Sequence, residues 1–312
     1  MVTVFPSVVD ISFPFNLFFS LSNNFVTLIF SDSTYEARYQ HPITKFTNEM
    51  IGKAQRAREA VEERIQDLLV RNHTRSSALR TVRYVAPLHK WTRFEQEVRD
   101  AFERQDWGAH SSTITIRPLG PLGPHNTANE QVIVGDETGV QGRFQQNVSH
   151  VMSAVFGSQG LNIRFGDFKA AGVPYERTPD VIILNDQNDI KVVGELKSPW
   201  VNGHKLVENP VQNQREDSFR RQIGQLARYM QDLEVQYGVY STYTQHVFLK
   251  QEFVGGRWSL LYSPIISDAT NPPSQLTVRQ CFFFLGKVAG QTGRFTNPTP
   301  PDEWAVGLEA NE

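Results

Sequence analysis

Residues 179–200 read PDVIILNDQNDIKVVGELKSPW, and this stretch decides how the second half of the chain folds. Two apolar runs, VIIL and IKVV, lie on either side of the polar residues 185–188. Runs rich in β-branched residues favour strands, and a cluster of Asn, Asp and Gln between two such runs favours a turn. The stretch therefore predicts a β-hairpin.

The sequence around this hairpin alternates between helical and strand-like periodicity. Apolar residues at three- and four-residue spacing predict helices over about 137–157 and 219–233, and a final helix that Ser274 caps. Strand-like runs lie between them: LNIRF before the hairpin, and YGVYSTY, HVFLKQEF and RWSLLYSPII after it. This order predicts an α/β fold in which helices flank a mixed central sheet.

Helical signals also dominate residues 36–125. Residues 46–72 show apolar residues at helical spacing and predict one amphipathic helix, and Phe94, Val98 and Phe102 predict a second. Their apolar faces either pack within the chain or pair two chains in a homodimer; packing within the chain is favoured because no heptad pattern is sustained. The run IRPLGPLGPHNTAN, rich in Pro and Gly, predicts a domain boundary.

The two ends of the chain differ from this pattern. Residues 1–35 are strongly apolar, with no charge between Asp10 and Asp32, which is about the length of a membrane span. Pro14, several Asn and Ser residues and the lack of basic residues at the start weigh against a span or a signal peptide. A flexible appendage or an incorrectly assigned gene start is favoured over a surface strand pair.

The expected organisation is thus an apolar appendage, a mainly helical extension, an α/β domain and a flexible C-terminal tail. These four parts span residues 1–35, 36–125, 126–290 and 291–312.

The composition excludes several classes of protein. One cysteine, Cys281, excludes an internal disulfide and a cysteine zinc site, lies among phenylalanines as a core residue would, and predicts a reducing compartment, the nucleus or the cytoplasm. A near balance of 31 Lys and Arg against 33 Asp and Glu excludes a histone-like DNA-coating protein. No histidine pair has metal-site spacing, and the usual dinucleotide, P-loop and serine-hydrolase motifs are absent from the sequence.

Charged residues at the end of the hairpin form the candidate site. The two-residue period of a strand puts Glu195 and Lys197 on one face, and Lys191 is expected on the same face. Asp180 starts the neighbouring strand, so its carboxylate can reach Glu195 across one strand spacing. Two carboxylates that close are favoured when a divalent cation lies between them, and a lysine beside them can orient water. The pattern predicts phosphodiester hydrolysis assisted by Mg²⁺ or Mn²⁺.

Other interpretations of these residues remain open. Glu195 and Lys197 could form only a surface ion pair, while Asp180 merely begins a strand. The carboxylate-x-Lys spacing recurs at 167–169 and 189–191, but neither copy follows an apolar strand with Pro-Asp before it.

The helix over 219–233 adds further candidates. Gln225 and Tyr229 lie one turn apart beside the apolar stripe, as side chains aimed at a cleft edge would. Trp200, just after the hairpin, either packs under the cleft, which is favoured, or stacks on a base. Four arginines on or beside the helix either contact phosphates or only increase solubility: Arg215, Arg220, Arg221 and Arg228.

At this point the sequence resembles the PD-(D/E)XK nuclease superfamily. Pro179-Asp180 with Glu195-x-Lys197 resembles its signature, and Gln225-x-x-x-Tyr229 resembles the Q-x-x-x-Y motif of its RecB-like and Cas4-like branches. The stretches VVGELKSPW, QIGQLARYM and YGVYSTYTQHVFLK are similar to uncharacterised fungal proteins with such a domain. The resemblance covers about residues 131–289.

The resemblance implies a restriction-endonuclease-like core and a set of roles. Asp180, Glu195 and the backbone carbonyl of Leu196 would bind metal, Lys197 would be the catalytic lysine, and Gln225 and Tyr229 would organise the site. Glu137 matches an acidic position that many members carry on the preceding helix, and Gln141 is a weaker match.

Together these observations predict a metal-dependent nuclease that acts on nucleic acid, DNA rather than RNA. The alternative is a catalytically inactive module of the same fold that binds nucleic acid or a protein. In that case the helices of the first half would supply the partner surface.

Overall fold

A computed structural model describes most of the chain. The described residues are 17–22, 25–30, 54–55, 57–74, 82–108, 114–115, 130–268 and 274–307.

The chain divides into two compact units, each described by itself. The first comprises Met1–Ala54 and Thr115–Leu122, and the second comprises Gln55–Ile114 and Gly123–Glu312. In the first unit, β1 (Leu17–Ser22) and β2 (Phe25–Phe30) form an antiparallel hairpin. No helix in the described ranges is both long and apolar enough to cross a membrane.

A mixed sheet forms the centre of the second unit. Strands β11 and β12 are parallel, as are β14 and β6, and the other pairs are antiparallel. The predicted α/β fold with a mixed sheet is confirmed. The strand order is β6 (Leu88–Lys90), β14 (Arg257–Tyr262), β13 (Gln245–Val254), β12 (Tyr237–Ser241), β11 (Ile190–Leu196), β10 (Val181–Asn185) and β9 (Ile163–Gly166), and β15 (Ile266–Ser267) also pairs with β13.

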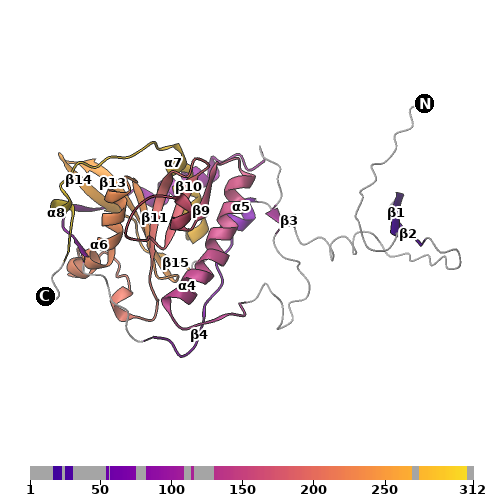
Figure 1. Cartoon of the computed structure of the whole chain (residues 1–312), viewed down its shortest axis with the longest axis horizontal. Helices are drawn as coiled ribbons and strands as arrows, with labels where there is room; N and C mark the ends of the chain where they lie inside the picture. The colour runs from indigo at the N-terminus through magenta and orange to yellow at the C-terminus, as the bar shows by residue number, and fades with distance from the viewer. Residues whose placement is uncertain are drawn as a thin grey trace. The chain divides into compact units, whose positions relative to one another are not determined.

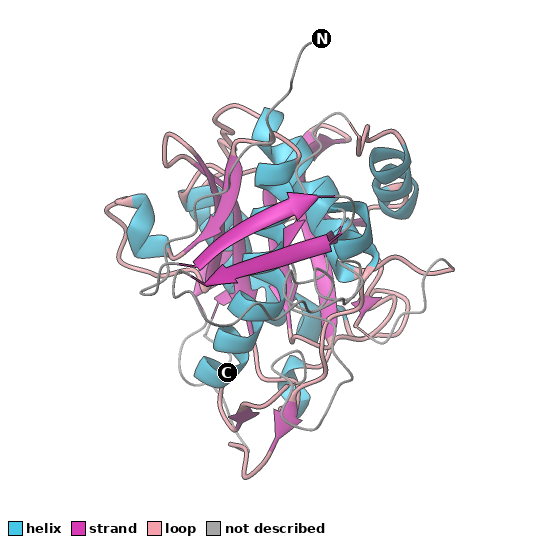
Figure 2. Cartoon of the chain, turned by 90° about the vertical axis from the view of Figure 1, so that its right-hand side faces the viewer, coloured by secondary structure: helices cyan, strands magenta, loops and turns pink. Residues whose placement is uncertain are grey.

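Helices cover both faces of this sheet (Figures 1 and 2). On one face, α6 (Glu216–Asp232) packs on a core that includes Val193 and Tyr240. On the other face, α7 (Val278–Gln291) packs with α3 (Phe94–Glu103) and α5 (His150–Ser158) around phenylalanine rings. α4 (Glu137–Phe144) runs through a π-helical turn (Gln145–Ser149) into α5. The second helix expected in the first half is confirmed as α3.

The predicted β10–β11 hairpin is also confirmed. Asn185 closes its turn, because Asn185 Oδ1 accepts hydrogen bonds from the amides of Gln187 (3.0 Å) and Asp189 (2.8 Å). Asn188 has a φ of 64°, a left-handed conformation that Asn adopts more readily than most residues.

A β-bulge near the start of β11 breaks the alternation of its side chains. Ile190 and Val193 both pack against the α6 core, which strict alternation would forbid. Lys191 is turned toward the end of α7, where its Nζ donates to Thr292 O (3.2 Å). The expectation that Lys191 shares a face with Glu195 is wrong, because the extra residue of the bulge turns the Lys191 side chain away from Glu195.

The prediction of one long helix over residues 46–72 is wrong for the described part of this range. Only α2 (Ala57–Glu62) is helical, and the chain continues into β4 (Leu69–Val70). The carbonyls near the end of α2 have partners from another segment: Val61 O accepts from Thr277 Oγ1 (2.6 Å), and Ala60 O accepts from Arg279 Nη1 (3.0 Å). These donors replace the amides of a further helical turn. Residues 46–53 and 56 lie outside the described residues.

The segments beyond the expected α/β domain also belong to the second unit. β6 joins the main sheet although it precedes the expected boundary at 116–129, whose own residues lie outside the described ranges. Within the expected flexible tail, the described residues 291–307 are ordered: α8 (Pro301–Trp304) leads into β16 (Ala305–Gly307), which pairs with β5 (Val82–Tyr84). Trp304 is fully buried.

Two further predictions concern α7. Thr277, and not Ser274, caps this helix, because its side chain accepts from Gln280 N in a capping box. Cys281 is a buried free cysteine, as its phenylalanine neighbours predict.

The remaining short elements are β3 (Ala54–Gln55), β7 (Ile114–Thr115), β8 (Ile133–Val134) and two 3₁₀ turns, Phe168–Ala171 and Asn202–His204.

Candidate functional site

Asp180 and Glu195 lie side by side at the open end of the β10–β11 hairpin. Asp180 N donates to Gly194 O (3.1 Å), which extends the ladder by one residue beyond Val181. Leu196 N donates to Asp180 Oδ2 (2.8 Å). The Asp180 carboxylate is therefore fixed against the end of β11, which carries Glu195.

Lys197 lies between two carboxylates. Its Nζ is 2.7 Å from Glu195 Oε1 and 3.0 Å from Glu137 Oε1, and the Lys197 side chain is only 8% exposed. The backbone amide of Lys197 donates to Ser241 O (2.8 Å), so the parallel pairing with β12 continues to this residue. The sheet thus holds the ammonium in place.

Glu137 reaches Lys197 because α4 begins at this residue. Asp136 caps the helix by accepting from Gly139 N (2.8 Å). A carboxylate in the first turn of a helix is also favoured by the helix dipole. The structure therefore brings together Glu137 and Lys197, which are 60 residues apart in the sequence.

Gln225 and Tyr229 complete the inner wall of the site. Gln225 Nε2 donates to Glu195 Oε2 (3.1 Å) and to the Tyr229 hydroxyl, and both side chains are buried. Because the two oxygens of Glu195 are held by Lys197 and Gln225, the orientation of this carboxylate is fixed.

Gln141 is one turn after Glu137 on α4 and holds the other carboxylate. Its Nε2 donates to Asp180 Oδ1 (2.8 Å), so both oxygens of Asp180 accept a hydrogen bond. The sequence indicates this residue only weakly, because neither its type nor its spacing marks a contact with a strand 39 residues away.

The electrostatics of the site indicate an excess of negative charge. Burial and the neighbouring Asp180 charge raise the pKa of Glu195 to about 8, although Lys197 opposes the rise. Burial alone would lower the pKa of Lys197, but the charges of Glu195 and Glu137 raise it above its usual range. The lysine therefore stays charged between Glu195 and Glu137, whereas Glu195 binds a proton more readily than an ordinary glutamate.

The donor atoms of the site suit a hard cation. The carboxylates of Asp180 and Glu195 and the carbonyl of Leu196 are oxygen donors of the kind that Mg²⁺ and Mn²⁺ bind, and the excess negative charge favours a cation. Within the described ranges, no group of three or more His, Cys, Asp or Glu side chains is arranged to hold a metal ion. Metal binding would therefore rely on the carboxylate pair and a backbone oxygen.

Three of the four candidate arginines contact groups other than the site. Arg220 donates to Ala86 O (2.8 Å), Arg228 donates to Ala305 O, and Arg221 pairs with Asp217 (2.9 Å). Arg215 is exposed at the start of α6.

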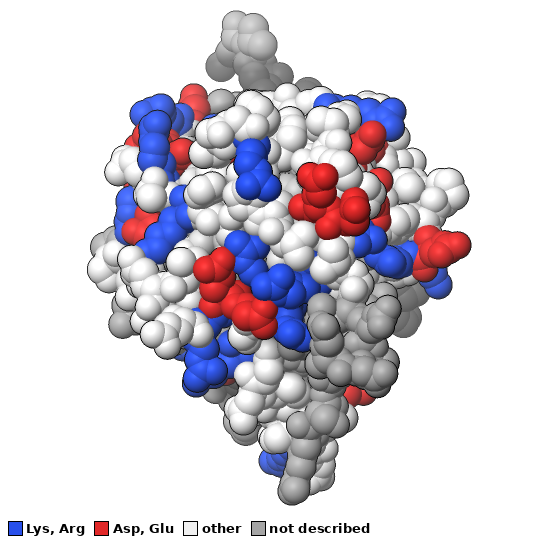
Figure 3. Space-filling view, turned by 90° about the vertical axis from the view of Figure 1, so that its left-hand side faces the viewer, with Lys and Arg blue, Asp and Glu red and all other residues white. Residues whose placement is uncertain are grey.

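The face of the molecule on which α6 lies is not uniformly positively charged. Figure 3 shows the face on which α6 and α8 lie in Figure 1, and there the Lys and Arg groups lie next to Asp and Glu groups. The structure thus gathers the carboxylates and the lysine but not these arginines.

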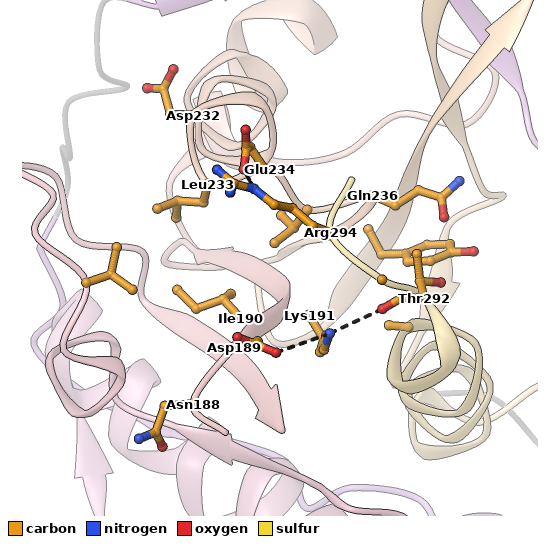
Figure 4. Close-up of a pocket in the computed structure, with 15 residues that line it drawn as sticks. Asn188, Asp189, Ile190, Lys191, Asp232, Leu233, Glu234, Gln236, Thr292 and Arg294 are labelled. Atoms are coloured by element: carbon orange, nitrogen blue, oxygen red, sulfur yellow. Dashed lines mark hydrogen bonds and ion pairs between the residues drawn. The ribbon is translucent and has the colours of Figure 1, made fainter. Parts of the chain in front are cut away.

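The other two carboxylate-x-Lys copies have separate roles. Asp167 caps the 3₁₀ turn by accepting from Lys169 N (2.9 Å). Asp189 and Lys191 line a cavity of about 460 Å³ (Figure 4). This cavity lies at the opposite end of β11 from Glu195.

Charged groups that line the cavity have partners outside the carboxylate–lysine cluster. Lys191 lies 3.8 Å from Asp189, Arg294 pairs with Glu234, and Asp232 accepts from the Tyr175 hydroxyl (2.7 Å). The cavity is therefore separate from the carboxylate–lysine cluster.

The fold and the site define a mixed α/β protein with a buried carboxylate–lysine cluster at the end of a central hairpin. No protein-family model, no curated protein and no solved structure matches the chain.

Proposed function

We propose that the protein is a divalent-metal-dependent nuclease that hydrolyses phosphodiester bonds in DNA. The observation that carries the proposal is the juxtaposition of Asp180 with Glu195, and of Lys197 Nζ 2.7 Å from Glu195. Paired carboxylates beside a buried, charged lysine are the groups that metal-assisted hydrolysis requires. The resemblance of these residues to the PD-(D/E)XK signature supports the same proposal.

The chain's own residues divide the work between them. Lys197 places a positive charge and hydrogen-bond donors next to the carboxylates, where it can orient a water molecule and stabilise negative charge on phosphate oxygens. Glu137 and Glu195 keep the ammonium in position. Gln225 and Gln141 hold the two carboxylates in fixed orientations, which limits reorganisation during the reaction.

Asp180, Glu195 and the Leu196 carbonyl would hold Mg²⁺ or Mn²⁺. When bound there, the ion would act as a Lewis acid and lower the pKa of water. Its charge would also offset the burial and the Asp180 charge that raise the pKa of Glu195.

An inactive interaction module is the second candidate. The observation that favours it is that, in the described part of the chain, no three acidic, His or Cys side chains form a metal-binding group. Such a module would bind nucleic acid or a protein without cleaving it.

A cleavage assay with matched carboxylate variants separates the two candidates. The purified protein is incubated with linear and circular DNA, with Mg²⁺, Mn²⁺ or a chelator. Asp180→Asn keeps the shape of the side chain and removes its charge, and Asp167→Asn is the control at a carboxylate-x-Lys copy that caps a 3₁₀ turn. We expect metal-dependent cleavage that is lost in Asp180→Asn and retained in Asp167→Asn. Equal activity in both variants, or none in the wild type, would reject the nuclease.

A further inference from the structure

A short segment of the first half lies along the start of α4. We call residues 69–74 the strap. β4 at its beginning pairs in parallel with β8, Arg71 N donates to Val134 O (3.2 Å), and Thr74 N donates to Gly135 O (2.9 Å). Gly135 permits this approach, because a Cβ there would lie 3.2 Å from Arg71 O.

The strap borders the candidate site through this contact. Glu137 follows Gly135 by two residues and pairs with Lys197. The chain after Lys197 reaches the strap from the other side, because the rings of Trp200 and His73 are 5.3 Å apart at an angle of 30°. Both segments that meet the strap thus also carry residues of the site.

The two rings form a shelf that is open to solvent. Trp200 is half-buried, whereas His73 is exposed. Part of the Trp200 ring is packed, and its indole Nε1 is buried and has no hydrogen-bond partner among the described residues. The exposed His73 ring offers a surface on which a further flat ring can stack.

The surroundings of the shelf suit a strand of nucleotides. Arg71 is exposed on the strap and can contact a phosphate. Three apolar side chains beside it, Leu69, Val132 and Ile133, are 45 to 50% exposed. Apolar and aromatic surface next to a basic side chain is the combination that binds the faces of unpaired bases and the backbone that joins them.

We propose that the Trp200–His73 shelf binds an unpaired base of the strand that is cleaved, so that the substrate is single-stranded or locally unpaired nucleic acid. The inference rests on the proposed nuclease function and specifies its substrate class. In a duplex the base faces are already stacked on one another, and a base must leave the stack to reach the shelf. A preference for single strands follows from that difference.

Binding assays in the presence of a chelator test the shelf without cleavage. The probes are fluorescein-labelled oligothymidylate, a hairpin duplex of the same number of nucleotides, and oligothymidylate in which one internal residue is abasic. The variants are His73→Ala and Trp200→Leu, and Phe253→Ala is the control because this exposed ring lies on β13, outside the shelf. Circular dichroism melting confirms that each variant is folded.

We expect tighter binding of the single strand than of the hairpin, and a loss of about tenfold in single-strand affinity in His73→Ala and Trp200→Leu. Phe253→Ala should bind like the wild type. One abasic residue should weaken wild-type binding but have little further effect in the shelf variants. Equal affinity for hairpin and single strand, or unchanged single-strand affinity in folded His73→Ala, would overturn the proposal.

The outcome is independent of the cleavage assay. If Asp180→Asn abolishes cleavage but His73→Ala binds single strands normally, the nuclease stands and the shelf is rejected. If no variant or wild type cleaves DNA but His73→Ala loses single-strand binding, the shelf stands and the nuclease is rejected.

Discussion

Lys197 Nζ lies 2.7 Å from Glu195 Oε1, and the two side chains are only 8% and 3% exposed. A buried ion pair is weak support for stability by itself, because both charges lose their hydration. Its value lies in geometry: the pair fixes an ammonium beside a second carboxylate, Glu137, and holds Glu195 next to Asp180.

Replacing Lys197 by Met should abolish cleavage and also destabilise the protein. Removal of one partner of a buried ion pair costs about 3 to 5 kcal/mol, because the other charge is left uncompensated. Urea unfolding measures the loss. Lys191→Met is the matched control, since this lysine is on the same strand and its side chain is 11% exposed. It should retain cleavage; loss of activity in both variants would indicate that the strand, and not the ammonium of Lys197, is responsible.

Gln225→Leu should lower kcat about 10- to 100-fold with a smaller change in stability. The variant removes the donor that holds Glu195 Oε2, and loss of such an orienting contact typically has an effect of this size. Tyr229→Phe should have a milder effect, because it removes only the acceptor behind Gln225. Steady-state kinetics with an oligonucleotide substrate compare the two. A larger loss in Tyr229→Phe would contradict this order.

Arg279→Leu should lower the free energy of unfolding by more than about 2 kcal/mol. The guanidinium donates to Ala60 O (3.0 Å) and Asn147 O (2.8 Å), and an unpaired buried carbonyl costs about 1 to 3 kcal/mol. Arg104→Leu is the control, because its side chain is 78% exposed. Urea unfolding at neutral pH measures both, and equal effects would show that the contacts of Arg279 contribute nothing.

His246 should make the stability depend on pH below neutrality. Burial lowers the pKa of His246 from 6.5 to about 3. Between these pH values the unfolded chain binds a proton that the folded protein does not. The free energy of unfolding therefore decreases by about 1.4 kcal/mol for each unit by which the pH is lowered. This stability is present above pH 6.5 and is lost toward pH 3.

Urea unfolding of His246→Met across this range isolates the contribution, because methionine does not titrate. The slope should decrease relative to the wild type. An identical slope in wild type and His246→Met would contradict the expected role of burial.

Local sequence signals were sufficient for the hairpin and for part of the site. The turn at Asn185 and the two-residue spacing of Glu195 and Lys197 involve neighbours in the sequence. The mixed sheet also follows from the order of strand and helix patterns. The bulge at Lys191 could not be predicted from this order, because only the pairing of β11 with β10 reveals it.

Contacts between distant segments account for the differences. Thr277 and Arg279, which are more than 200 residues away, donate to the carbonyls at the end of α2. The helix ends there although apolar residues continue at helical spacing. In the described C-terminal part, the buried Trp304 anchors the chain, and its Nε1 donates to Ala227 O (2.9 Å) in the core. For the same reason, no pattern indicates that Gln141 holds Asp180 or that His73 lies on Trp200.

Titration calorimetry with Mn²⁺ tests the central claim most directly. The claim is that Asp180 and Glu195 form a divalent-metal site, and Glu195→Gln removes the charge of the buried ligand while keeping its shape. We expect the wild type to bind Mn²⁺ with heat that is lost in Glu195→Gln and retained in Asp167→Asn. Equal binding by wild type and Glu195→Gln, or no binding by the wild type, would contradict the account.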